Sequence, residues 1–217
     1  MIWDWGFAGQ ILPDLLWHFA RFTLLATVLG SVFAAILGLV FAIVRRLGIP
    51  VLAQLVTAFV TFVRSTPLIV QLFFLFYVLP VVGITLPAFL TGVLGLGIHY
   101  STYYAEVYRA GIDGVPKGQW EACTSLSLPT RYAWQHVVLP QAIRNVLPAL
   151  GNYAISMFKE SPFLALITVP ELVQTARSLG ALHFSYVEPF TIAGLIFLAA
   201  SYPTAVLLRR LEIRLGH

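Results

Sequence analysis

Charged side chains are rare in this chain, and a few of them stand inside long apolar stretches. Arg64 is followed by Thr66 and Pro67, and Glu160 closes another apolar run. A charged side chain near the middle of a membrane helix costs about 2.5 to 3.5 kcal/mol, so one that persists there usually faces a cavity or a partner. Arg64 and Glu160 would offer complementary charges to a small zwitterion that bears a carboxylate.

Two plainer interpretations of these residues stay open. Arg64 could pair with Glu106 or Glu160 as a buried ion pair, and Lys159 and Glu160 could extend toward lipid headgroups. The alternative is a polar path through the membrane, and its candidate residues are Arg64, Thr66, Gln71, Asn152, Ser156 and Glu160.

The chain carries no motif of catalysis or metal binding. It contains no G-x-x-x-x-G-K-[ST], no H-E-x-x-H and no G-x-S-x-G, its five histidines are dispersed, and Cys123 is the single cysteine. We therefore predict a non-catalytic subunit without a cofactor of its own. Thirteen Lys and Arg residues lie scattered among apolar runs, which argues against a nucleic-acid partner.

Composition indicates a helical membrane protein. The 217 residues are 59% hydrophobic and 10% charged, with a mean hydropathy of +0.87, whereas soluble domains are about 45–50% apolar and about 25% charged. A soluble domain would need far more polar residues to cover its surface. Residues 1–10 contain Asp4 and no basic residue, unlike a cleavable signal peptide, so we expect the whole chain to be retained.

The uncharged stretches predict five membrane spans within a single membrane domain, residues 1–217. A spanning helix needs about 20 apolar residues, because backbone groups in lipid must be hydrogen-bonded within the segment. Arg21 to Arg45 encloses 23 uncharged residues, and the 41 uncharged residues from Ser65 to Ala105 are interrupted by Pro80, Gly83 and Pro87, which favours two helices. The expected spans lie near 18–44, 52–79, 87–109, 138–160 and 188–208.

Basic residues predict the orientation, since they accumulate on the cytoplasmic side. Eight lie on one side of the expected spans, namely Arg45, Arg46, Arg109, Lys117, Arg131, Arg209, Arg210 and Arg214. The other side holds Arg21, Lys159 and Arg177. We therefore expect the N-terminus outside, and the C-terminus and the polar loop 110–136 in the cytoplasm.

Small residues recur every fourth position in the first expected span, at Ala26, Gly30, Ala34, Gly38 and Ala42. Such a stripe lets another helix approach closely. It predicts a packing face, although alanine and glycine are also common in membrane helices generally.

The loop 110–136 shows the most specific pattern. Gly114 to Pro116 predicts a turn, Gly118 the start of a short helix, and Ser127 to Pro129 a second break. Trp120, Tyr132 and Trp134 flank this helix, so the loop is a candidate docking surface for a soluble partner.

This loop resembles the coupling loop of bacterial ABC importer permeases, whose pattern is E-A-A, three residues, G, nine residues, I, one residue, L-P. Glu121, Ala122 and Cys123 take the first three positions, Ser127 stands at the glycine, and Val137, Leu139 and Pro140 complete the spacing. RSTPLIVQ (64–71), YYAEVYRAGIDGVPKGQWEA (103–122), LPQAIRNVLPALGN (139–152) and KESPFLALITVPEL (159–172) are similar to the polar amino acid branch. The resemblance covers residues 20–208.

The resemblance implies the type I importer permease fold with five helices and cytoplasmic coupling helices. It also implies a second permease (sister chain or identical copy), two cytoplasmic ATPases that bind ATP and Mg²⁺, and an external solute-binding protein. The loop from Gly118 to Leu128 would insert into a groove on the ATPase, with Glu121 fixing its orientation. The expected coupling residues are Gly118, Glu121, Ala122, Cys123, Ser127 and Leu128.

The expected substrate is a polar amino acid or a related compatible solute, and overall similarity, including the MIWDWGFA start, suggests ectoine or hydroxyectoine. Two other function classes need no ATPase. A secondary transporter or channel would work alone, but five helices without an internal repeat make alternating access by one chain awkward. A membrane scaffold without transport is the third class.

Overall fold

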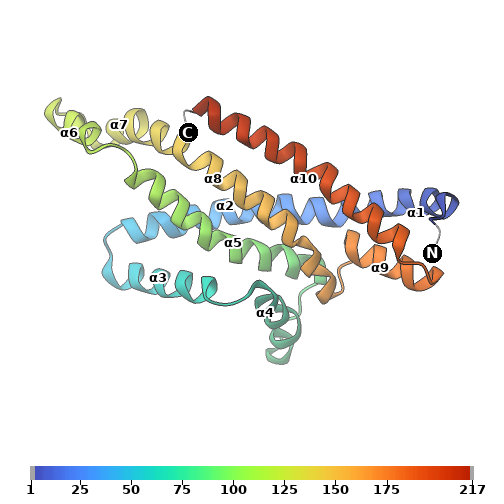
Figure 1. The fold of residues 1–217 in the computed structure, drawn as a ribbon. Coiled ribbons are helices and arrows are strands. Elements are labelled where there is room, and N and C mark those ends of the chain that lie inside the picture. Colours follow the sequence, from blue (N-terminus) through green and yellow to red (C-terminus); the bar gives the residue numbers. More distant parts are fainter. Residues whose placement is uncertain (1–2, 216–217) are drawn as a thin grey trace.

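The computed structural model describes residues 3–215 and consists of helices joined by short connections (Figure 1). In chain order the elements are α1 (Trp5–His18), η1 (Phe19–Leu24), α2 (Leu25–Arg46), α3 (Pro50–Arg64), α4 (Leu68–Phe73), η2 (Phe74–Val78), η3 (Leu79–Val82), α5 (Ala88–Asp113), α6 (Lys117–Ser125), α7 (Thr130–Ala133), η4 (Trp134–Val138), α8 (Leu139–Glu160), η5 (Ser161–Ile167), α9 (Leu172–His183) and α10 (Val187–Leu215).

The first helical run is longer than the expected span 18–44. It continues from Trp5 to Arg46, 42 residues, through the π-helical turn η1. The extra length has a cap of its own, because the Asp4 carboxylate accepts hydrogen bonds from the backbone N–H groups of Gly6 (2.8 Å) and Phe7 (3.1 Å). The added segment α1 also packs against α9 and α10, which the charge count could not reveal.

The small-residue stripe of α2 is the packing face that the sequence predicts. Its five members are buried, and α5 lies against them. A Cβ atom on Gly38 would lie 2.7 Å from both the carbonyl oxygen of Ser101 and the Cβ of Tyr104 on α5. The two backbones therefore approach too closely at this point for any side chain.

The second expected span, 52–79, corresponds to two helical parts rather than one continuous helix. α3 ends at Arg64, α4 begins at Leu68, and the two helical parts are bent by 105°. Pro67 causes the break, because it has no N–H for the carbonyl of Val63 and disfavours a helical conformation at Thr66. The segment α4–η3 consequently turns away from the axis of α3 (Figure 1).

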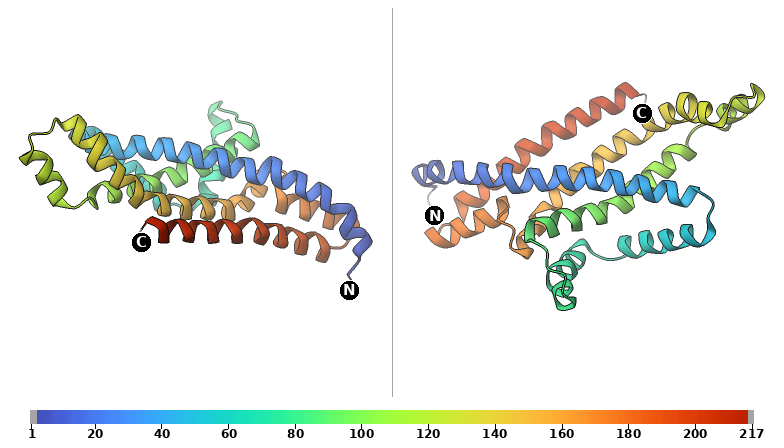
Figure 2. Two further views of the ribbon diagram at one scale, coloured as in Figure 1. Left: turned by 90° about the horizontal axis from the view of Figure 1, so that it is seen from above. Right: turned by 180° about the vertical axis from the view of Figure 1, so that it is seen from behind.

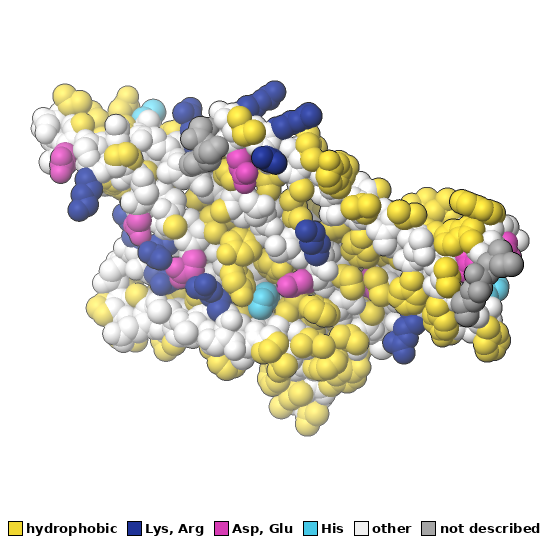
Figure 3. Space-filling model, viewed as in Figure 1, with side chains coloured by type: hydrophobic (Ala, Val, Ile, Leu, Met, Phe, Trp, Pro, Cys, Tyr) yellow, Lys and Arg dark blue, Asp and Glu magenta, His cyan; other side chains and the backbone are white. Residues whose placement is uncertain are grey.

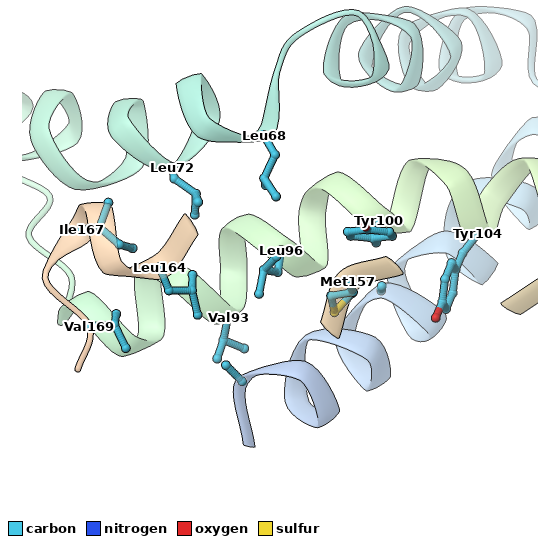
Figure 4. Packing of buried hydrophobic residues seen from close by; sticks show 12 residues of the cluster. Leu68, Leu72, Val93, Leu96, Tyr100, Tyr104, Met157, Leu164, Ile167 and Val169 are labelled. Carbon is cyan, nitrogen blue, oxygen red and sulfur yellow. The ribbon is translucent and has the colours of Figure 1, made fainter. Parts of the chain in front are cut away.

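The main core forms where α4, α5, α8 and η5 meet the first helical run. Leu72, Leu96 and Leu164 come from α4, α5 and η5 and are fully buried. Figure 4 shows them pointing toward one another, with Met157 of α8 on the other side of α5 from α4. This packing fixes the bent α4 against α5 without a continuous helix from α3.

A second cluster joins the N-terminal helix α1 to α9 and the beginning of α10. Apolar side chains of α1, α9 and α10 pack together, and the Glu188 carboxylate accepts hydrogen bonds from the backbone N–H of Asp4 (3.0 Å) and the hydroxyl of Ser185 (2.5 Å). The helix α9 was not expected, since its 12 residues are too short to appear as a span. Figure 2 shows the N-terminus and α9 at one end of the molecule and the α6–α7 segment at the other.

Length and composition select two helices of the described chain as able to cross a membrane, Trp5–Arg46 and Val187–Leu215. Counting the bent pair α3 and α4–η3 as one span gives a third. α5 and α8, at the positions of the remaining expected spans, carry more polar side chains, and the number of five crossings stays a prediction.

Candidate functional site

The expected coupling residues lie on α6 and the turn that follows it. Gly118, Glu121 and Ala122 are exposed, and no ion pair within residues 3–215 includes Glu121. Cys123 is the buried residue of α6, with its side chain turned toward the bundle. The helix therefore offers one face for docking and attaches by the other.

Ser127 makes the bend after α6. Its φ is +52°, in the left-handed region that favours glycine. The backbone N–H of Leu128, which is half-buried, donates to the carbonyl oxygen of Cys123 at 3.0 Å and closes the helix end. Ser127 thus forms the bend at the position where the coupling-loop pattern has glycine.

Two tryptophans attach this loop to the first long helix. The rings of Trp120 and Trp134 meet edge to face, with centroids 5.3 Å apart. The Arg46 guanidinium at the end of α2 lies 5.2 Å from the ring of Trp134 and 6.0 Å from that of Trp120, and it also binds Asp113 at 3.2 Å. The small core beneath the loop consists of Val115, Val138 and Ala142, with Ile112 and the two tryptophans around them.

A chain of charges continues from this attachment along α2 and α5. Glu106 binds Arg45 (2.5 Å) and Arg109 (2.9 Å), and Arg109 also binds Asp113 (3.1 Å). In Figure 3 most of the Lys and Arg side chains of the visible face lie over this half of the molecule, around α6, α7 and the end of α10. Alternating charges therefore connect α2 with α5 next to the loop.

An aromatic cluster lies beside the break between α3 and α4. The Arg64 guanidinium lies 5.1 Å from the ring centroid of Tyr103 on α5, a cation–π geometry. Tyr103 contacts Tyr153 of α8 (centroids 5.2 Å apart) and Tyr100 of α5 (6.0 Å), and the hydroxyl of Tyr100 donates to the carboxylate of Glu160 at 2.9 Å. Three tyrosines thus separate a guanidinium from a carboxylate.

The expected ion pair of Arg64 with Glu106 or Glu160 is wrong. Glu106 is bound by Arg45 and Arg109, and none of the ion pairs within residues 3–215 includes Arg64 or Glu160. Arg64 does not pair with Glu106 because Arg45, at the end of α2, occupies that carboxylate. Arg45 and Glu106 are 61 positions apart, so the sequence alone could not reveal their contact. Arg64, which is exposed, keeps its guanidinium available for a ligand.

The six residues of the expected path fall into two groups. Arg64, Thr66 and Gln71 lie at the break, and Glu160 joins them through the tyrosines. Asn152 and Ser156 lie elsewhere on α8: the Asn152 amide donates to Glu212 of α10 (3.1 Å), and the Ser156 hydroxyl donates to the carbonyl oxygen of Asn152. The structure therefore does not bring these two side chains to the aromatic cluster.

Sequence reasoning proposed Tyr153 beside Glu160 but missed the aromatic residues that α5 contributes to the site. His99, Tyr100 and Tyr103 form one polar face of α5 inside the longest uncharged stretch. The run HYSTYY at 99–104 was the available signal, because it is unusually polar for an apolar span. Among the described residues, no group of three or more His, Cys, Asp or Glu side chains is placed to hold a metal ion.

Comparisons with known proteins agree on one kind of membrane subunit. The chain is 45% identical to the "Probable amino-acid ABC transporter permease protein y4tG" of Sinorhizobium fredii (strain NBRC 101917 / NGR234), over 98% of this chain and 94% of the relative. It is 33% identical to the "L-cystine transport system permease protein TcyB" of Bacillus subtilis (strain 168), over 96% and 91%.

Solved structures show the same fold. A chain in the crystal structure of an amino acid ABC transporter with histidines superposes with a TM-score of 0.92 at 34% identity, covering 99% of this chain and 100% of that one. An inward-facing MetNI methionine ABC transporter chain has a TM-score of 0.71 at 18% identity, covering 96% and 97%, which supports the fold alone.

The family model described as "Binding-protein-dependent transport system inner membrane component" matches residues 30–217. This range begins within α2 and extends through α10, so it contains both the α6 segment and the aromatic cluster. The chain belongs to this family of inner-membrane components of binding-protein-dependent transport systems.

Proposed function

We propose that this chain is the permease subunit of an ATP-driven importer that carries a polar amino acid into the cytoplasm. The observation that carries the proposal is α6, a short helix that exposes Gly118, Glu121 and Ala122 and is attached to the bundle through Cys123 and Trp120. Two ABC ATPases, each with bound ATP and Mg²⁺, would receive such helices and supply the hydrolysis that this subunit lacks.

The attachment of α6 suggests how ATP binding reaches the membrane part. Closure of the ATPases would draw the α6 segments of two permeases together. Because Arg46 contacts both loop tryptophans, that movement would also act on α2. The permease then behaves as a two-state element biased by nucleotide from inside and by a loaded solute-binding protein from outside.

A second permease, either an identical copy or a sister chain, completes the path. Asn152 and Ser156 hydrogen-bond to Glu212 and to the backbone but stay exposed on α8, where lipid would offer them no further polar partner. A facing subunit would supply a polar surface for them. In this arrangement the N-terminus lies outside and the C-terminus in the cytoplasm, as the distribution of basic residues indicates.

The aromatic cluster is the proposed substrate contact within the path. Arg64 would bind the carboxylate of a zwitterion, while Glu160 and the tyrosine rings would attract its cationic group. The relatives named above transport amino acids according to their names, so an amino acid is the primary candidate. Ectoine, a small zwitterion of the same charge pattern, is the second candidate, and it rests on the sequence resemblance that includes the MIWDWGFA start.

Uptake by reconstituted vesicles tests this function. The permease is inserted together with its ATPase and binding protein, and uptake of labelled glutamine, arginine, cystine and ectoine is measured with and without ATP and vanadate. We expect uptake of an amino acid that stops without ATP and is inhibited by vanadate. Uptake that proceeds without ATP hydrolysis would contradict the importer and support a secondary transporter or channel.

A further inference from the structure

The side chain of Gln71 bridges the break between α3 and α4. Its amide nitrogen lies 2.8 Å from the carbonyl oxygen of Val63, 2.8 Å from the hydroxyl oxygen of Thr66 and 3.1 Å from the carbonyl oxygen of Thr66. One amide group of α4 therefore serves three oxygen atoms at the end of α3. The Thr66 hydroxyl also lies within hydrogen-bonding distance of the carbonyl oxygens of Phe62 (3.2 Å) and Val63 (3.1 Å), so the break is closed by the side chains of Thr66 and Gln71 together.

The missing N–H of Pro67 explains why this bridge is needed. In an unbroken helix the N–H of residue 67 would donate to the carbonyl of Val63, four positions earlier. Gln71 supplies a side-chain donor in its place, beside the longer hydrogen bonds that the Thr66 N–H (3.3 Å) and hydroxyl (3.1 Å) donate to the same carbonyl oxygen. At 2.8 Å the Gln71 hydrogen bond is the shortest of the three, and because it comes from α4 it stabilises the bent conformation against alternatives.

His99 of α5 fixes the other end of the Gln71 amide. Its Nδ1 lies 3.2 Å from the Gln71 side-chain oxygen, and the ring is 8% exposed. Because the amide nitrogen is occupied by acceptors, the oxygen of Gln71 must accept, and the His99 Nδ1 must carry the hydrogen. The pair thus ties the break to a defined position on α5.

The same face of α5 holds Arg64. Tyr103 follows His99 by one helical turn, with ring centroids 5.3 Å apart, and the Arg64 guanidinium lies over Tyr103. Arg64 is also the residue directly after Val63, whose carbonyl Gln71 binds. The two hydrogen-bonded residues therefore determine both the backbone that carries Arg64 and the helix face that it meets.

We propose that Gln71 and His99 are positioning residues, which hold Arg64 over Tyr103 and act on the substrate only through it. This proposal rests on the proposed function, in which Arg64 binds the substrate carboxylate. It changes the role of Gln71 and Thr66 from candidate ligands to supports of the ligand. It also gives His99, one of five dispersed histidines in the sequence, a role in substrate affinity.

Direct binding to the purified permease–ATPase complex tests the proposal. The probe is whichever of glutamine, arginine, cystine or ectoine the vesicle assay identifies, titrated without the binding protein so that Kd reports on the membrane site. We expect Gln71→Leu and His99→Leu each to weaken binding about tenfold, because each removes buried hydrogen bonds. His99→Asn, whose amide nitrogen can replace Nδ1 as donor, is expected to keep Kd within about twofold.

Matched controls separate positioning from general damage. Thr66→Val removes a hydroxyl between α3 and α4 that is bonded to Gln71, whereas Thr57→Val removes a hydroxyl within α3 whose hydrogen bond goes to the carbonyl of Ala53. We expect a weaker Kd for the first variant alone. Co-purification of the ATPase with each variant measures assembly, and the Thr57→Val complex is expected to keep the basal ATP hydrolysis of the unmodified complex.

The double variant decides between positioning and direct contact. If Gln71 acts through Arg64, adding Gln71→Leu to Arg64→Ala leaves the Kd of Arg64→Ala unchanged. Effects that add would overturn the positioning role. An unchanged Kd in Arg64→Ala would contradict the substrate contact of the proposed function. If instead Arg64→Ala weakens binding while Gln71→Leu and His99→Leu leave the Kd unchanged, the substrate contact stands and only the positioning role is rejected.

Discussion

Two sharp bends of the chain, after α6 and between α3 and α4, are made by different means. The bend after α6 lies at an exposed surface, where Ser127 adopts a left-handed conformation and the N–H of Leu128 closes the helix end. The break between α3 and α4 lies against α5, where the Gln71 amide replaces the donor that Pro67 lacks. The first bend depends on one residue's backbone, and the second on a side chain from another helix.

Solvent explains the difference. Water satisfies carbonyl groups that an exposed helix end leaves free, so only the conformation of the turn residue matters there. The break lies against α5 with Thr66 and Gln71 half-buried, and lipid offers no donor there, so each freed carbonyl needs a donor from the protein. Changes at the exposed bend should therefore alter stability slightly, while changes at the break should alter the site that the break positions.

The largest effect is expected on α6 itself, which the exposed bend presents to its partner. Glu121→Lys reverses the charge of an exposed residue on the proposed docking face and should lower substrate-stimulated ATP hydrolysis about 100-fold or more, since a like-charge contact costs several kcal/mol. Membrane insertion of the subunit should be unaffected. Hydrolysis and uptake in reconstituted vesicles are the measurements.

Gln135→Lys is the control for this charge reversal, because it also places a lysine at an exposed position of the loop, in η4. It should change hydrolysis much less. Normal transport by Glu121→Lys would remove α6 from the coupling interface.

The second-largest effect is expected from restoring the backbone N–H that Pro67 lacks at the break between α3 and α4. In Pro67→Ala, the new N–H competes with Gln71 for the Val63 carbonyl and allows α3 and α4 to straighten, so uptake should fall about tenfold. Spin labels on the exposed residues Gln54 and Val78 would report the change in their separation. Pro50→Ala is the matched control, because a proline in the first helical turn has no helical partner for its N–H. An unchanged label separation in Pro67→Ala would show that the proline is not what bends the chain.

A third junction, between η5 and α9, is closed by a buried carboxylate, and its stability should depend on pH. Glu171 is fully buried and caps α9 by accepting hydrogen bonds from the N–H groups of Val173 (2.9 Å) and Gln174 (2.7 Å). Burial raises the pKa of its carboxyl to about 7, even though these hydrogen bonds favour the charged form. The folded state then binds a proton more tightly than the unfolded state between about pH 4.5 and 7.

The sign of the pH effect follows from this linkage. Stability should be greatest below about pH 4.5 with respect to this group and should fall by up to about 3 kcal/mol as pH rises through 7, at about 1.4 kcal/mol per pKa unit. The apparent Tm of the purified protein at several pH values is the measurement. Glu171→Gln should flatten this part of the profile, and a profile of equal slope in the variant would assign the pH dependence to other groups.

The smallest effect is expected from Ser127→Gly. Glycine relieves the left-handed strain and should stabilise the protein by about 1 kcal/mol or less, seen as a small rise in apparent Tm. Ser125→Gly places the same residue inside α6 and should lower stability by a similar amount. Equal shifts of both variants would show that backbone strain at Ser127 is not what limits this bend.

Local patterns in the sequence predicted the parts of the fold that depend on local physics. The four-residue recurrence from Ala26 to Ala42 predicted a close helix contact, and Gly38 makes it against α5. The turn signals around Gly114 and Ser127 predicted α6 in the right place. Both features need only the chain near them.

Features that depend on distant segments were not predictable in this way. Arg45 reaches Glu106 across 61 positions and displaces the pairing expected for Arg64. The helix α9 depends on a buried cap and on contacts with α1 and α10 rather than on a long apolar run. The aromatic cluster needed the relative rotation of α5 and α8, which no periodicity in either segment specifies.

The unbroken helix from Trp5 to Arg46 has a mechanical consequence. At 1.5 Å per residue its 42 residues measure about 63 Å, roughly twice the hydrocarbon thickness of a bilayer. One helical run therefore extends from the Asp4 cap, next to α9 and α10, to Arg46 beside the loop tryptophans. This run connects the two ends of the molecule by a route that does not include the aromatic cluster, and Pro13 and the π-helical turn η1 are the positions where it can bend.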